Sequence, residues 1–135
     1  MNRKASFHGL SFGTTRADLI KAALESICFQ VRAVLDAMGS GSNPGIGSVA
    51  IHGGISQNGF IRECLASLLK ATIRNQGNPE ISAQGAALLA GLQANIFQSQ
   101  DEIKSLLKLN TLQGAARSND LNKRYSRWLD LIRTV

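Results

Sequence analysis

The sequence is poor in cysteine, histidine and aromatic side chains, and these shortages exclude several classes of site. Its two cysteines, Cys28 and Cys64, lie in apolar surroundings of helical pattern, outside any CxxC motif. We expect them to be reduced, buried side chains that form neither a disulfide nor a metal site. The two histidines, His8 and His52, are isolated from each other and from the cysteines, so no zinc site is expected.

Long hydrophobic runs are also absent. No apolar stretch approaches the roughly 18 residues that a membrane-spanning helix needs. The first ten residues carry basic charge, but the apolar segment of a secretory signal does not follow them. We therefore expect no membrane partner and a cytoplasmic location.

The charge balance is basic, with 15 Lys and Arg against 9 Asp and Glu, which gives a net charge of +6. Such a balance permits nucleic-acid binding. However, the basic residues are dispersed, and only five Phe, one Tyr and one Trp could stack on bases. A solvated basic face is the favoured interpretation, and we expect no nucleic-acid partner. Its densest part is C-terminal: Lys123, Arg124, Arg127 and Arg133.

The length of 135 residues and the hydrophobic content of 44% fit a single globular domain over residues 1–135. The first long element is predicted to be a helix from about residue 15 to 38. Thr15 and Asp18 have the spacing of a capping box, and Gly39 can end the helix. The predicted apolar face repeats with a period of 3.6 residues: Ile20, Leu24, Ile27, Cys28, Val31, Val34, Leu35 and Met38.

Short strands and helices alternate after this helix. The pattern predicts a strand in "SVAIHGG", a helix from 56 or 57 to about 70, a weak strand in "ATIRNQ" and a helix in "SAQGAALLAGLQAN". This alternation predicts an α/β fold in which helices flank a short parallel sheet with right-handed crossovers. Two convincing strands are too few for an independent sheet, so we expect the chain to be part of a larger one.

The C-terminal third is also predicted to be helical, ambiguously from "DEIKSLLKL" onward and clearly in the closing helix, about 118–135. In that closing helix, Tyr125, Trp128, Leu129 and Ile132 fall on one side.

The stretch "IHGGISQNGF", residues 51–60, is the main candidate site. Gly53 and Gly54 follow the first predicted strand and precede a helix. Paired glycines let a ligand approach the backbone, and a helix start presents free N–H groups to an anion or a polar ring. A tight strand-to-helix turn explains the same residues. Neither GxxxxGK[ST] nor a GxGxxG between a strand and a helix is present, so the residues alone leave both interpretations open.

Three blocks in register resemble the C-terminal part of the FGGY carbohydrate kinases. They are "GLSFGTTRADLIKAALESICFQVRAVLDAM", "IHGGISQNGFIRECLASLLKATI" and "EISAQGAALLAGL", and the resemblance covers about residues 9–103. The closing "RYSRWLDLI" is similar to the Tyr…Trp helix that often ends such kinases. Where many relatives have Asp before the two glycines, this chain has His52.

The resemblance implies a partial actin-like (ribonuclease-H-like) ATPase domain. FGGY kinases transfer the γ-phosphoryl group of Mg-ATP to a hydroxyl of a sugar or polyol, in a cleft between two such domains. By this resemblance, Gly53 allows the turn, the backbone of Gly54 packs on the nucleotide, and Asn58 hydrogen-bonds the adenine or ribose side. The small residues Gly85 and Ala86 are expected to let their helix pack on the sheet behind this loop.

The family's phosphate loops, acceptor-binding residues and catalytic Asp lie upstream of the segment that this chain resembles. We therefore assign no catalytic residue and no metal ligand. The expected function is the C-terminal, adenosine-binding portion of an ATP-dependent sugar or polyol kinase, inactive alone, with ATP or ADP as ligand and Mg only in the complete kinase. The alternative is a non-catalytic module that self-associates or pairs with an upstream kinase half. The sequence does not identify the sugar or polyol.

Overall fold

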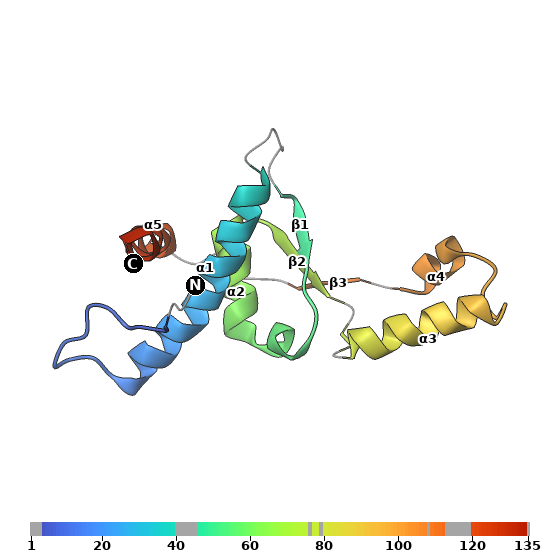
Figure 1. The fold of residues 1–135 in the computed structure, drawn as a ribbon, viewed down its shortest axis with the longest axis horizontal. Helices are drawn as coiled ribbons and strands as arrows, with labels where there is room; N and C mark the ends of the chain where they lie inside the picture. The colour runs from blue at the N-terminus through green and yellow to red at the C-terminus, as the bar shows by residue number, and fades with distance from the viewer. Residues whose placement is uncertain are drawn as a thin grey trace.

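The computed structural model describes residues 4–39, 46–75, 77–78, 80–107, 109–112 and 120–134. In these ranges the chain forms helices, one short 3₁₀ turn (η1) and three strands (Figure 1). In chain order they are α1 (Arg16–Gly39), β1 (Ser48–Ala50), η1 (Gly54–Gln57), α2 (Gly59–Leu69), β2 (Thr72–Asn75), α3 (Ile81–Gln93), α4 (Gln100–Leu106), β3 (Asn110–Leu112) and α5 (Asp120–Thr134).

The strands form one sheet in the order β1-β2-β3. β1 and β2 are parallel, with Val49 opposite Ile73, which confirms the predicted strand-helix-strand unit. The sheet also has a strand that was not predicted, because β3 pairs antiparallel with β2 and makes the sheet mixed. Strand β3 was not predicted because three residues are too few to show an alternating pattern.

The start of α1 has the predicted capping box. The backbone N and Oγ1 of Thr15 donate to Asp18 Oδ2 at 3.0 and 2.7 Å, and the backbone N of Asp18 donates to Thr15 Oγ1 at 3.2 Å. The hydrogen bonds from the Thr15 side chain and backbone hold the pKa of Asp18 below its usual value. These bonds fix the point at which α1 begins.

The core lies where α1 packs against α2 and the sheet. Its most deeply buried side chains are Cys28 from α1, Ile61, Cys64 and Leu68 from α2, and Ile73 from β2. Both cysteines are buried, as predicted. The neighbouring Cys64 thiol and burial raise the pKa of the Cys28 thiol, so the reactive thiolate is suppressed.

Helix α5 packs on α1 and α2 through aromatic side chains. The ring centroid of Phe29 lies 5.7 Å from that of Tyr125 and 5.8 Å from that of Trp128. The Tyr125 hydroxyl donates to Asp36 Oδ2 at 2.9 Å, and burial, followed by this contact, raises the pKa of Tyr125. The predicted closing helix and its apolar side are thus present.

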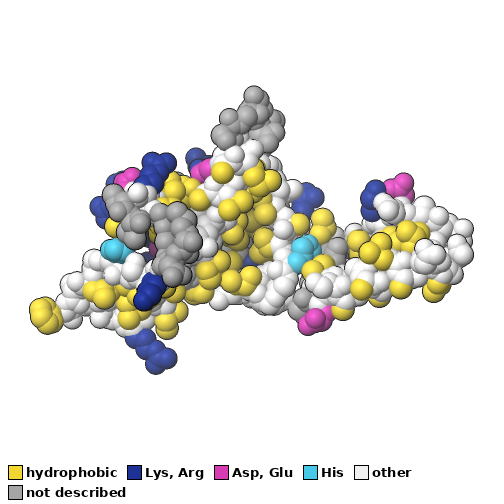
Figure 2. All heavy atoms as spheres, in the orientation of Figure 1, with side chains coloured by type: hydrophobic (Ala, Val, Ile, Leu, Met, Phe, Trp, Pro, Cys, Tyr) yellow, Lys and Arg dark blue, Asp and Glu magenta, His cyan; other side chains and the backbone are white. Residues whose placement is uncertain are grey.

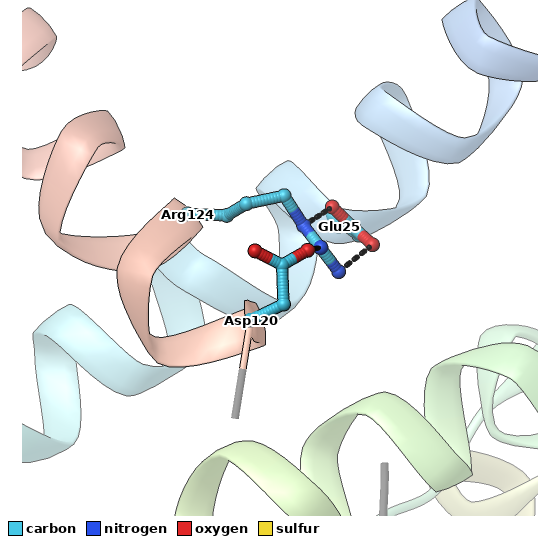
Figure 3. A network of polar contacts seen from close by, with 3 residues as sticks. All are labelled: Glu25, Asp120 and Arg124. Carbon is cyan, nitrogen blue, oxygen red and sulfur yellow. Dashed lines mark hydrogen bonds and ion pairs between the residues drawn. The ribbon is translucent and has the colours of Figure 1, made fainter. Parts of the chain in front are cut away.

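A polar network also holds α5 on α1 (Figure 3). Arg124 donates from Nε and Nη2 to the two carboxylate oxygens of Glu25, each at 3.0 Å, and from Nη1 to Asp120. The Glu25 side chain is only 6% exposed. Arg124 was predicted to lie on a solvated basic face, and for this residue the prediction was wrong, because the buried carboxylate of Glu25 needs a charged partner.

The predicted apolar face of α1 is only partly covered. Leu24, Cys28 and Val31 contact the core, whereas Ile20, Ile27, Val34 and Met38 remain exposed. Hydrophobic side chains gather on this side of the molecule, where α1, α2 and β1 lie (Figure 2). The repeat of apolar residues correctly predicted a helix with one apolar face. Such a repeat does not show whether another element covers that face.

Within the described ranges, none of the helices is both long enough and apolar enough to cross a lipid bilayer.

Replacing Arg124 with Ala should destabilise the fold by about 2 kcal/mol, because Glu25 would stay buried without its charged partner. We place the effect below that of a fully buried pair because the Arg124 side chain is 33% exposed. Urea unfolding followed by circular dichroism measures the change. Asp120→Asn is the matched control, since the Asp120 side chain is 60% exposed and its pair should contribute no more than about 0.5 kcal/mol. Equal effects of the two variants would show that Glu25 does not depend on Arg124.

Candidate functional site

The glycine pair sits where β1 leads into α2. Gly53 has φ 80° and ψ 176°, a backbone conformation that glycine adopts without strain and that other residues rarely adopt. The chain reverses here and enters η1, so Gly53 makes the turn that the sequence predicts.

Hydrogen bonds hold this turn in one shape. The backbone N and Oγ of Ser56 both donate to the carbonyl oxygen of Gly53, at 3.1 and 2.7 Å. Ser56 is 2% exposed, and its own carbonyl accepts from Nη1 of Arg62 at 3.3 Å. The loop is therefore fixed by its own side chains and by α2.

The backbone of the two glycines faces open space. A Cβ atom built on Gly53 or Gly54 would meet no other heavy atom within 4 Å among the described residues. Ile55, the next residue, exposes 47% of its surface. An incoming flat molecule could thus reach the peptide of Gly54 and an apolar side chain at the same place.

Asn58 is the N-cap of α2. Its Oδ1 accepts from the backbone N of Phe60 at 3.0 Å and of Ile61 at 3.4 Å. This cap satisfies two N–H groups of the first helical turn. Asn58 is exposed and its Nδ2 amide takes no part in this cap, so its two N–H groups can donate to a ligand.

His52 lies between β1 and Gly53 and is partly buried. Its Nδ1 atom is buried without a hydrogen-bond partner in the part of the chain that the structure describes. A neutral imidazole can donate or accept at this position, but it cannot provide the two acceptor oxygens of a carboxylate. His52 therefore places a buried, unsatisfied nitrogen next to the glycine turn.

The expected packing of α3 on the sheet behind the loop is not formed. A Cβ on Gly85 would have open space around it, Ala86 is exposed, and α3 points away from the sheet together with α4 (Figure 1). The close approach occurs at Gly91 instead, where a Cβ would lie 2.6 Å from the Phe97 ring. Gly91 is thus the α3 glycine that allows a close contact, with Phe97 in the turn that leads to α4.

The described ranges contain no group of three or more His, Cys, Asp or Glu side chains that could hold a metal ion. The residues gathered at the loop are a glycine backbone, an amide donor, an imidazole and an apolar side chain. Such a set can bind a polar ring.

Comparison with known proteins shows that the chain, including this loop, matches a protein family. The model of the C-terminal domain of the FGGY family of carbohydrate kinases matches residues 1–94. Glycerol kinase from Streptococcus agalactiae serotype Ia is 35% identical over 135 residues, which cover 99% of this chain. Glycerol kinase from Streptococcus pneumoniae strain Hungary19A-6 is 38% identical over 105 residues, which cover 78% of this chain.

The fold agrees with this assignment. The crystal structure of Plasmodium falciparum glycerol kinase with ADP superposes with a TM-score of 0.76 and 27% identity over 98% of this chain. The actin-like ATPase fold class that the resemblance implied is thereby confirmed. The chain spans only 27% of the length of that protein and 27% of the Streptococcus agalactiae relative. The chain belongs to the FGGY family of carbohydrate kinases and corresponds to a C-terminal portion of such a kinase.

Proposed function

We propose that this chain is the C-terminal, adenosine-binding portion of an ATP-dependent sugar or polyol kinase. In such a kinase, bound Mg-ATP supplies the γ-phosphoryl group that a carbohydrate hydroxyl accepts. The observation that carries the proposal is the open backbone at Gly53 and Gly54, fixed by Ser56 and bordered by the Asn58 cap. Family membership and the ADP in the similar Plasmodium falciparum structure support it.

Each residue of the loop has a distinct task in this proposal. Gly54 has no side chain, so the nucleotide can pack directly on its peptide, and exposed Ile55 offers an apolar contact for the adenine ring. The Nδ2 amide of Asn58 donates to the adenine or ribose side while Oδ1 continues to cap α2.

The phosphates and Mg are assigned no partner in this chain. Its described ranges hold no cluster of metal-ligating side chains, and the family's phosphate loops and catalytic Asp belong to the upstream part. The chain therefore provides half of a nucleotide site and none of the groups that activate the acceptor hydroxyl. A cytoplasmic location, where ATP is available, agrees with two cysteines that are buried in the core.

The isolated chain should bind ADP weakly, in the millimolar range, because only the adenosine half of the site is present. Isothermal titration calorimetry measures the binding. Gly54→Val should abolish it, because the new side chain fills the space that the nucleotide needs. If titration of ADP into the wild-type chain gives no heat of binding, the proposed half-site is rejected.

Two controls separate ligand contact from folding. Gly47→Val places the same side chain in open space before β1, at the other end of the strand, and should leave ADP binding unchanged. Asn58→Ser keeps a capping oxygen but removes the amide donor, whereas Asn58→Ala removes both. If Asn58 contacts the nucleotide, both variants lose affinity, and only Asn58→Ala also loses about 1 kcal/mol of stability.

The purified chain should not phosphorylate glycerol or xylulose with Mg-ATP, because phosphoryl transfer requires a positioned γ-phosphate and an acceptor base. A coupled assay of ADP release, with glycerol kinase as the positive control, tests this. Turnover that rises with the concentration of this chain would contradict the proposed inactivity.

A second candidate function is a non-catalytic interaction module derived from such a kinase. The exposed apolar residues of α1 favour it, because uncovered apolar surface drives association. This candidate expects concentration-dependent self-association in light scattering, without ADP binding. A monodisperse monomer at all concentrations would count against it.

A further inference from the structure

Arg62 of α2 reaches back to the loop that carries the glycine pair. Its Nη1 atom donates to the carbonyl oxygen of Ser56 at 3.3 Å. Its Nη2 atom would lie 3.8 Å from a Cβ atom built on Gly59, the first residue of α2. The guanidinium therefore lies across the junction of η1 and α2 (Figure 1), beside the residues that flank Asn58.

Asn58 and Arg62 lie on the same side of α2, because residues four apart are neighbours on a helix surface. Asn58 is exposed and Arg62 is partly buried. A guanidinium carries five N–H groups and no acceptor, and the contact with Ser56 uses one of these N–H groups. A base that meets the Nδ2 amide of Asn58 thus also meets a second, charged donor.

Four acceptor atoms around the loop are already engaged within the protein. The Gly53 carbonyl accepts from the backbone N and Oγ of Ser56. The Ile55 carbonyl accepts from the backbone N of Asn58 at 3.1 Å. The Ser56 carbonyl accepts from Arg62, and Asn58 Oδ1 accepts from two N–H groups of the first turn of α2. The side chains of Asn58 and Arg62 therefore present donors to a ligand.

Donors of this kind distinguish the two purine bases. The N7 edge of guanine presents two acceptors, O6 and N7, whereas the same edge of adenine presents N7 beside an amino group that is itself a donor. A guanidinium is the commonest protein partner of the guanine edge. Opposite adenine, the guanidinium would face the amino group, donor against donor, and one N–H group would stay without an acceptor.

Gln57 is the exposed polar side chain of η1. Its amide carries both donors and an acceptor, and it can turn either kind of group toward a base. Gln57 therefore fits both purines and does not restore a preference for adenine. The choice between the bases falls to Asn58 and Arg62.

We propose that Arg62 sets the base preference of this site, so that the site takes guanine nucleotides at least as well as adenine nucleotides. The proposal rests on the proposed function, since it assigns the base to the same loop. Exposed Ile55 offers its apolar contact to either purine ring.

NMR titrations test the base preference, because they measure dissociation constants in the millimolar range. The ¹⁵N-labelled chain is titrated with ADP, GDP and IDP. GDP should bind as tightly as ADP or more tightly. IDP keeps O6 and N7 but lacks the 2-amino group of guanine, and it should bind like GDP because the proposed contacts are to O6 and N7.

Arg62→Met keeps a long side chain and removes the guanidinium. This change should weaken GDP binding about tenfold more than ADP binding, because only guanine loses a pair of matched contacts. The ratio of the two affinities is the decisive quantity, since a loop loosened by loss of the contact with Ser56 would weaken both nucleotides alike. Arg127→Met is the matched control, because Arg127 is exposed on α5 and its loss should leave both affinities unchanged.

Two results would overturn this base preference and keep the nucleotide site: GDP binding that is clearly weaker than ADP binding, or an affinity ratio that Arg62→Met does not change. Tight binding of GDP that IDP does not share would assign the preference to the 2-amino group, and would also overturn the role of Arg62. If neither ADP nor GDP shifts a signal of the loop, the nucleotide site is rejected together with its base preference.

Discussion

The packing of α1 on α2 is the contact on which the rest of the structure depends. Cys28 and Cys64 lie at this packing, and both are almost completely removed from water. The same two helices present the surface on which α5 rests, and α2 in turn covers the sheet. Arg32 of α1 adds a polar contact by donating to the carbonyl of Leu68, near the end of α2. Without this helix pair, α5 and the sheet would lose the apolar surface on which they pack.

The glycine loop is positioned by the same framework. β1 ends, Gly53 turns the chain, and Asn58 starts α2 within a few residues. The shape of the loop is therefore set by a strand and a helix that are both anchored in the core. A rigid, ready-made loop suits a ligand site, because little conformational entropy is lost on binding. The open backbone of Gly54 thus depends on the buried side chains of Ile61 and Cys64, which anchor α2 in the core.

Features that depend on a local pattern of residues could be predicted from the sequence. The capping box of Thr15 and Asp18, the turn at Gly53 and the apolar side of α5 all follow from spacing and residue type. The Glu25–Arg124 pair could not be predicted, because its members are 99 residues apart. Strand β3 is too short for a pattern. The glycine loop was predicted as a candidate site from its residues. Its ligand was inferred from the family resemblance, since a tight turn needs the same residues.

The distance in sequence between Glu25 and Arg124 also bears on the order of folding. Closing a loop of this length has an entropic cost that must be met before the contact forms. The capping box, α2 and the β1–α2–β2 unit need far shorter loops. We expect these parts to form first and α5 to settle onto them last. Until α5 arrives, the carboxylate of Glu25 stays hydrated, so the final step of folding both desolvates this charge and neutralises it.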